Sequence, residues 1–196
     1  MNMKVIYIRD SKSRGYLKIG ISDGDKKYEY TLSEAEYREC GSLLSGDEIF
    51  DTDTLKRCDM RYRAKLYALR ILAFGDNNVQ TLIRKLISRS ISSDIAKEVA
   101  TEMVGRGYID EHRQLERLIE REVNDNLSGK EKLILKLASK GYRREKIESV
   151  LEELVLSGAV DFEASKNKLI SKKLGEGASA EDVRKLLCKY GYRIND

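Results

Sequence analysis

Hydrophobic residues recur along this chain with two different periods, and the change of period divides the chain into two parts. Up to about residue 54, apolar and polar residues partly alternate in short stretches such as KVIYI, YLKIGI and KYEYTL, which is the period-two pattern of β-strands. From about residue 61 onward, apolar residues follow the 3.6-residue period of amphipathic helices. The pattern therefore predicts a mainly α-helical protein with a small N-terminal β-meander, α+β overall.

The strand-rich segment, residues 1–54, is expected to fold as a three-stranded meander. Asp23-Gly24 favours a hairpin turn, and Ser33 with Glu36 forms a capping-box pattern that opens a short helix, ended by Gly41 or Gly46. A meander of this size is marginal alone and needs a cover on one face. The stretch FDTDTLKRCD, residues 50–59, is predicted to be a linker to the helical part.

The helical part contains an internal repeat. KLISRSISSDIAKEVATEMVGRGYID, residues 85–110, and KLASKGYRREKIESVLEELVLSGAVD, residues 136–161, match at a constant offset of 51 residues. Under that offset Leu82 corresponds to Leu133, Val99 to Val150 and Gly107 to Gly158. A fixed period of this length is typical of repeated supersecondary units.

Each repeat is predicted to hold three helices. In the first repeat, residues 55–110, the first helix carries an apolar stripe of Leu66, Leu69, Ile71 and Leu72, and the other helices run over about 79–89 and 93–104. The second repeat covers residues 111–161. The third, residues 162–196, is truncated to two helices. Because each unit has a small apolar face, neighbouring units must stack, and an elongated, curved array is expected.

Turn and cap residues support these boundaries. Gly107 and Gly158 are expected at helix C′ positions, where glycine adopts positive φ without strain, and Asp110 and Asp161 are expected to cap the helices that follow. Two further helix starts are predicted from serine: Ser128 with Glu131 as a capping box, and Ser179 as a cap.

Charge is uneven along the chain. The chain holds 37 Lys and Arg against 33 Asp and Glu, a net charge of +4. Residues 1–54 carry a net −3 and residues 55–196 a net +7, so the basic excess lies on the helical repeats. This favours a polyanionic or acidic partner, although a highly charged helical surface by itself explains the excess about equally well.

The sequence offers little catalytic chemistry. His112 is the only histidine, which leaves no Ser-His, Cys-His or two-His metal site within one chain. No phosphate-binding glycine loop of the P-loop type is present. Cys40, Cys58 and Cys188 are scattered and are expected to be reduced thiols. We therefore expect no enzyme and no cofactor.

The helical pattern resembles the RecX family, bacterial regulators of the RecA recombinase. The resemblance rests on an A-x-x-x-A-L-R-x-L helix, here with Ala64, Ala68 and Arg70, and on units of the form L-x-x-K-L-x-x-[KR]-G-[FY], followed by I-x-x-[VA]-[LI]-x-x-L and a closing G-[LIV]-[LIV]-D. The second repeat follows this form from Leu133 to Asp161. The resemblance spans nearly the whole chain, including a strand-rich lead segment found in some members.

The resemblance implies a non-enzymatic modulator that lies along the groove of the RecA–DNA filament and limits strand exchange, ATP hydrolysis and co-protease activity in recombination, DNA repair and the SOS response. We expect the partner to be the RecA filament, together with sequence-independent contacts to the DNA phosphate backbone. The residues expected to face the filament and its DNA are Lys136, Lys140, Arg143, Arg144, Lys172, Lys173, Arg184, Lys185 and Lys189.

Other functions stay open. A DNA-binding helical-repeat protein that acts as a transcription or chromatin factor without RecA is the main alternative, although Glu145 and Glu148 beside Arg143 and Arg144 argue against base readout. A scaffold that binds neither is a third. We also expect a cytoplasmic monomer, because neither a signal-peptide pattern nor a run of about 18 apolar residues occurs.

Overall fold

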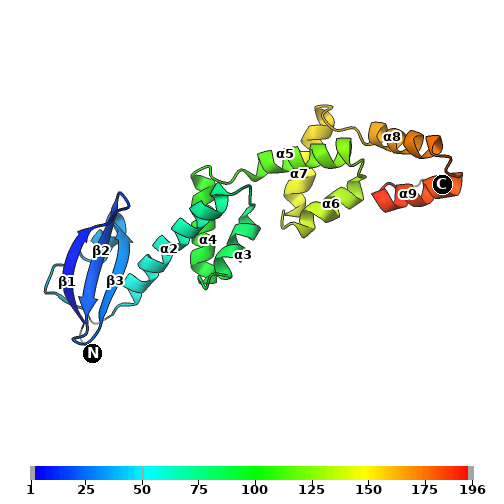
Figure 1. The fold of residues 1–196 in the computed structure, drawn as a ribbon. Coiled ribbons are helices and arrows are strands. Elements are labelled where there is room, and N and C mark those ends of the chain that lie inside the picture. Colours follow the sequence, from blue (N-terminus) through cyan, green and yellow to red (C-terminus); the bar gives the residue numbers. More distant parts are fainter. Residues whose placement is uncertain (1–2, 50, 194–196) are drawn as a thin grey trace. The chain divides into compact units, whose positions relative to one another are not determined.

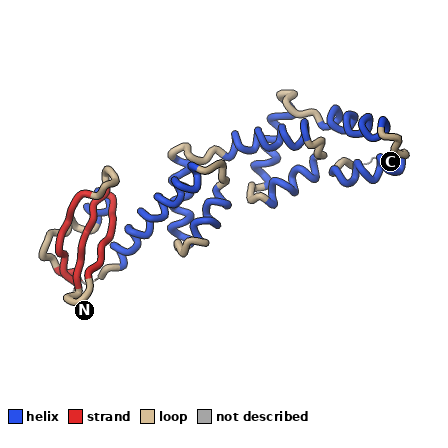
Figure 2. The backbone as a smooth tube through the Cα atoms, viewed as in Figure 1, coloured by secondary structure: helices blue, strands red, loops and turns tan. Residues whose placement is uncertain are grey.

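The computed structural model describes residues 3–49 and 51–193, which form two compact units. The first unit takes in the chain up to Gly75 together with Leu82–Gly105, and the second takes in Asp76–Thr81 together with the chain from Arg106 onward. Strands occur in the N-terminal part, and the described chain beyond it is helical (Figure 2). The mainly α, α+β fold class is confirmed, whereas the division into four domains stays a prediction.

The N-terminal sheet is antiparallel and has one more strand than the sequence indicated. β1 (Met3–Asp10), β2 (Tyr16–Ser22) and β3 (Lys27–Ser33) form the predicted meander, and β4 (Glu48–Ile49) pairs with β1 to give the order β3-β2-β1-β4 (Figure 1). The hairpin between β2 and β3 turns at Gly24, whose φ is +99°. β4 is only two residues long, too short to give a period-two signal of its own.

The short helix that follows the sheet begins as predicted. Ser33 and Glu36 form a complete capping box at the start of α1 (Glu34–Glu39). Gly41, at a φ of +84°, stands directly after the C-cap residue, so Gly41 and not Gly46 marks the end of the helix.

Most of the predicted linker, residues 53–59, is instead the first part of a long helix, and Phe50 lies outside the described residues. α2 runs over Asp53–Ala73, and Leu55 and Cys58 are buried with the apolar face of the sheet. This helix supplies the cover that the meander needs. It also protects the edge of the sheet, because the backbone N–H of Thr31 in β3 donates to Oδ1 of Asp59 at 3.0 Å.

The side of α2 that is buried differs from the apolar stripe in the sequence. Leu66 and Leu69 are 47% and 38% exposed, whereas Ala64 and Ala68 are fully buried. α2 contacts α4, and alanines bring two helix backbones closer together than leucines do. Close approach therefore decides the buried face, and the burial that the leucine stripe indicated is wrong.

The 51-residue repeat is confirmed as a repeat of burial. α3 (Val79–Ile87) and α4 (Ser93–Gly105) correspond to α6 (Lys130–Ser139) and α7 (Arg144–Leu156). The buried side chains match in pairs: Leu82 with Leu133, Leu86 with Leu137, Val99 with Val150, and Met103 with Leu154.

The turns repeat as well. Gly107 and Gly158 have φ values of +74° and +75°. Asp110 caps α5 (Glu111–Glu120) by accepting a hydrogen bond from the Arg113 amide, and Asp161 caps α8 (Phe162–Gly175) through the amides of Glu163 and Ala164. The predicted glycine and aspartate positions are confirmed.

The second unit contains one apolar cluster that joins three helices. Leu115 and Ile119 from α5, Leu133 and Leu137 from α6, and Ile147 from α7 are each fully buried. α5 continues into a π-helical turn, η1 (Arg121–Asp125), which adds Val123 to the same cluster. The cluster is the core of the predicted second repeat.

A polar network fixes the segment Asp76–Thr81 within this unit. Asn78 donates through Nδ2 to the carbonyl of Lys140 at 3.0 Å, and Glu111 accepts the backbone N–H of Val79 at 2.9 Å. Deeper inside, the Tyr142 hydroxyl donates to Oε1 of Gln114 at 2.9 Å. Each of these buried polar groups has a partner, which is the condition for burying them at low cost.

The last two helices pack on the loop that precedes α6. α8 and α9 (Ala180–Tyr190) enclose a small apolar cluster with that loop, made of Leu127, Leu169, Val183 and Leu187. Ser179 forms a capping box with Asp182, so the cap predicted there is confirmed.

The predicted capping box at α6 is wrong. The N-cap residue is Gly129, and no side chain caps the helix. The Gly129 N–H donates to the carbonyl of Tyr190 at 2.7 Å, so the end of α9 meets the start of α6 backbone to backbone. A Cβ atom on Gly129 would collide with the carbonyl of Gly191.

Among residues 3–49 and 51–193, none of the helices combines the length and the apolar character that crossing a lipid bilayer requires.

Substitution of Gly129 tests this backbone contact. Gly129→Ala is expected to destabilise the α8–α9 pair by about 1–3 kcal/mol, the usual cost of forcing atoms into a filled space. Hydrogen exchange of the α9 amides should become faster, and thermal unfolding should begin at a lower temperature. Gly175→Ala is the matched control, because a Cβ there meets nothing within 4 Å. Equal exchange rates in the two variants would contradict the proposed contact.

Candidate partner-binding surface

Lys136, one of the predicted binding residues, pairs with a carboxylate in the interior of the protein. Its ammonium group lies 2.7 Å from both carboxylate oxygens of Glu122, whose side chain is 2% exposed. Burial raises the pKa of Glu122, but hydrogen bonds from Lys136 and Asn126 and the charges of Lys136 and Lys140 together outweigh it and hold the pKa below its usual value. Lys136 therefore neutralises a buried carboxylate.

The π-helical turn explains why a glutamate is buried there. It places Glu122 and Val123, which are neighbours in sequence, both in the interior. The loop that follows turns back onto it, and the Ser128 amide donates to the Glu122 carbonyl at 2.9 Å. Ser128, predicted as a helix cap, instead anchors this loop.

Lys140 and Arg143 flank the turn between α6 and α7, and both side chains are exposed. Within the described residues neither forms a salt bridge. Lys140 is held at its backbone by Asn78, and Arg143 is the N-cap residue of α7. The backbone of each residue is thus held in place by the fold, and each charged side chain is accessible to a partner.

Several other predicted residues form local ion pairs on helix surfaces. Arg144 pairs with Glu148 at 2.8 Å, Lys185 with Glu181 at 2.7 Å, and Lys173 with Glu176. The hydrogen bond between Lys173 and Glu176 raises the pKa of the lysine and lowers that of the glutamate. Exposed pairs of this kind contribute little to stability, so these cations can exchange partners. Lys172, Arg184 and Lys189 are also exposed.

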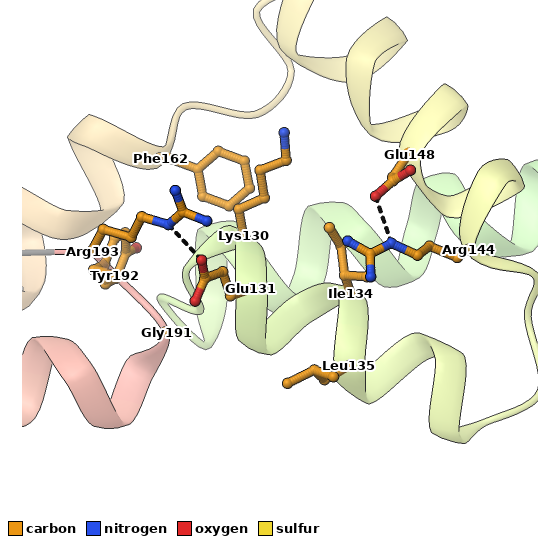
Figure 3. Close-up of a pocket in the computed structure, with 10 residues that line it drawn as sticks. All are labelled: Lys130, Glu131, Ile134, Leu135, Arg144, Glu148, Phe162, Gly191, Tyr192 and Arg193. Atoms are coloured by element: carbon orange, nitrogen blue, oxygen red, sulfur yellow. Dashed lines mark hydrogen bonds and ion pairs between the residues drawn. The ribbon is translucent and has the colours of Figure 1, made fainter.

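The structure brings some of these cations together around α6. One hollow of about 690 Å³ places Arg144 opposite Lys130 and Arg193 (Figure 3). A second hollow places Lys136 near Lys132 and Lys189. Lys172 and Lys173 lie on the last turns of α8, and Arg184 and Lys185 lie on α9.

Sequence reasoning missed the apolar partners of these cations. Leu135 is 70% exposed and lines both hollows, and Phe162 and Tyr192 line the first. A signal for Leu135 was present, because it falls outside the helical stripe formed by Leu133, Ile134 and Leu137. Tyr192 carries a hydroxyl oxygen that is buried without a hydrogen-bond partner.

The candidate catalytic groups occupy ordinary structural positions. His112 is half exposed, with Nε2 lying 3.0 Å from Glu153 and Nδ1 lying 3.6 Å from Glu116. Cys58 is buried in the core of the first unit, where burial raises the pKa of its thiol to about 12. Within the described ranges, no group of three or more His, Cys, Asp or Glu side chains is arranged to hold a metal ion.

Comparison with known proteins identifies the fold. A solved structure described as regulatory protein RecX superposes with a TM-score of 0.71 at 18% identity, covering 97% of this chain and 95% of that chain. RecX from Lactobacillus salivarius aligns over 67% of this chain and 97% of its own, with a TM-score of 0.46 at 17% identity. No protein-family model matches this sequence, and no curated protein matches it. The chain therefore has the RecX fold.

Removal of the Lys136 charge tests how much the Lys136–Glu122 pair contributes to the stability of the fold. Lys136→Met leaves Glu122 buried without its cation and is expected to lower the free energy of unfolding at neutral pH by about 1–3 kcal/mol. Lys168→Met, at an exposed position in the same unit, should change it by less than about 0.5 kcal/mol. Chemical denaturation of both variants at pH 7 measures the difference.

The same pair gives a pH dependence of known sign. Because the folded-state pKa of Glu122 is lowered, its stabilising contribution is present above the unfolded-state pKa of about 4.3 and is lost as the pH falls below it. The gap in stability between wild type and Lys136→Met should therefore narrow on acidification. A gap that stayed constant from pH 7 to pH 3 would contradict the ion pair.

Proposed function

We propose that this chain is a non-enzymatic regulator that binds the RecA–DNA filament and inhibits its recombinase, ATPase and co-protease activities. The observation that carries the proposal is the RecX fold over nearly the whole chain, reached independently of the repeat pattern in the sequence. Such a regulator would act in DNA repair and the SOS response.

The distribution of charge supports binding to a filament that contains DNA. Lys140 and Arg143 project from the α6–α7 turn, and Lys172 is exposed near the end of α8. Lysine and arginine contacts to phosphates release counterions and need no particular base sequence. The carboxylates of Glu145 and Glu148 follow Arg143 at the start of α7, which disfavours insertion of this helix into a groove to read bases.

Inhibition would arise from a difference in affinity between filament states. A protein that binds one conformation of the filament more tightly than another shifts the filament toward that conformation, by no more than the difference in binding free energy. A regulator without a reactive centre can lower ATP hydrolysis in this way, because it holds the filament in a state that turns over slowly.

Co-sedimentation with RecA filaments on single-stranded DNA, together with the ATPase rate, tests the proposal. The wild-type chain should sediment with the filament and reduce ATP hydrolysis. The triple variant Lys140→Glu, Arg143→Glu and Lys172→Glu should bind about tenfold more weakly, and its affinity should depend less steeply on salt. Each of these side chains is exposed, so folding should be preserved.

A control with the same change of charge separates a local effect from a general one. Lys12→Glu, Arg14→Glu and Lys26→Glu reverse three exposed cations in the loops of the N-terminal sheet and should leave filament binding nearly unchanged. Unchanged sedimentation of the first triple variant would overturn the placement of the surface. A sequence-specific footprint on duplex DNA without RecA would instead favour the transcription or chromatin factor.

A further inference from the structure

Leu135 is a large apolar side chain on α6 that is exposed to solvent. It is 70% exposed on α6, although its neighbours Leu133, Ile134 and Leu137 are buried. The two hollows described above lie on either side of it, since both are lined by Leu135 together with Glu131 and Gly191. An exposed leucine alone is ordinary, but an apolar side chain between two concave surfaces is a common feature of binding sites.

The first hollow combines an apolar floor with cationic walls. Ile134, Phe162 and Tyr192 supply the apolar surface, and Lys130, Arg144 and Arg193 surround it. In the close-up, Arg193, Phe162 and Lys130 lie on one side, and Arg144 lies on the other (Figure 3). A volume of about 690 Å³ lies within the range of small-ligand pockets and would accommodate one or two side chains.

The chain's own carboxylates show which chemical group these arginines accept. Glu131 pairs with Arg193 at 2.5 Å and Glu148 with Arg144 at 2.8 Å. Both pairs are well exposed, so their net stabilisation is small. A partner's carboxylate could take the place of either glutamate at little cost and would be received in the same geometry.

The charge of the combined surface is strongly unbalanced. Six cations line the two hollows, against two carboxylates, Glu131 and Glu148; the cations are Lys130, Lys132, Lys136, Arg144, Lys189 and Arg193. Lys136 is engaged with Glu122, and Lys132 lies over the ring of Tyr190 at 4.4 Å. Even with those two engaged, the remaining cations outnumber the carboxylates and complement an acidic ligand.

We propose that these two hollows, with Leu135 between them, dock a short acidic segment of a partner protein that carries one large apolar side chain. The apolar side chain fills the first hollow against Ile134 and Phe162, and flanking carboxylates bind Arg144, Arg193 and Lys130. The proposal specifies the chemistry recognised at part of the surface assigned to filament binding, and it does not require the partner to be RecA.

A nucleotide suits this lining less well than a peptide. Binding a run of bases uses several aromatic side chains as stacking platforms, and the first hollow is lined by two aromatic residues, Phe162 and Tyr192. Phosphate groups alone would bind the cations but would make no apolar contact with Leu135 and Phe162. The combination of apolar floor and cations favours the acidic peptide.

Fluorescence anisotropy with labelled peptides tests the proposal on the full-length chain. The probe is a short peptide with a central phenylalanine flanked on each side by aspartates. It should bind saturably, and more weakly as salt is added. Replacing the phenylalanine with alanine, or the aspartates with asparagines, should weaken binding about tenfold in each case. Equal binding of the alanine peptide, or no saturable binding, would overturn the proposal.

Variants of the chain locate the site. Leu135→Ala and Lys130→Glu, both at exposed positions, should each weaken peptide binding about tenfold. Leu156→Ala and Lys168→Glu are matched controls in the same unit, because both side chains are exposed and line neither hollow. Equal losses in the controls would overturn the location. If a single-stranded oligonucleotide competes fully with the peptide and is itself weakened by Leu135→Ala, the surface is a nucleic-acid site and the proposal fails.

Sedimentation of the same variants with RecA filaments keeps the two proposals separate. Filament binding without any peptide binding would leave the proposed function standing and reject the docking site. If the chain does not sediment with filaments but binds the peptide, and this binding needs Leu135 and Lys130, the docking site is supported and the proposed function is rejected.

Discussion

Burial of one apolar stripe per helix holds the helical part of this protein together. α5, α6 and α7 are 10, 10 and 13 residues long, and helices below about 12–15 residues are marginal in water on their own. Each becomes stable only where residues such as Leu115, Leu133 and Ile147 lose all contact with solvent together. The aspartate caps and positive-φ glycines then set where each helix begins and ends, so that the stripes meet in register.

What the sequence predicts well is local or periodic. The 51-residue offset predicted matching buried positions, and Asp110, Asp161 and Ser179 were correctly placed as caps, because a cap depends on residues within one turn. The failures are those where a distant segment decides. Ser128 and Glu131 carry a capping pattern, but the end of α9 occupies the start of α6. Residues 53–59, predicted as part of a linker, are helical, and Leu55 and Cys58 pack there against the N-terminal sheet.

The sequence predicted which residue types make up the binding surface, but it did not predict the contacts that those residues make in the folded chain. Clustered lysines and arginines could be read from the sequence, but the partners that lie far away along the chain could not. Lys136 and Glu122 are 14 residues apart, and Arg193 and Glu131 are 62 apart, so both pairings depend on the fold. The exposed Leu135 shows the same limit. Its departure from the apolar period was visible, whereas the concave surfaces around it needed the packing of α6, α8 and α9.

The capped sheet edge has a consequence for how this protein can associate with others. Asp59 takes the amide of Thr31 on the outer strand, and the opposite margin ends in a two-residue strand. An incoming chain would find that main-chain donor already occupied, so pairing with β3 at this point would have to break its contact with α2. Strand addition is therefore disfavoured beside Thr31, and the hydrogen bond to Asp59 makes the packing of α2 part of the edge protection of the sheet.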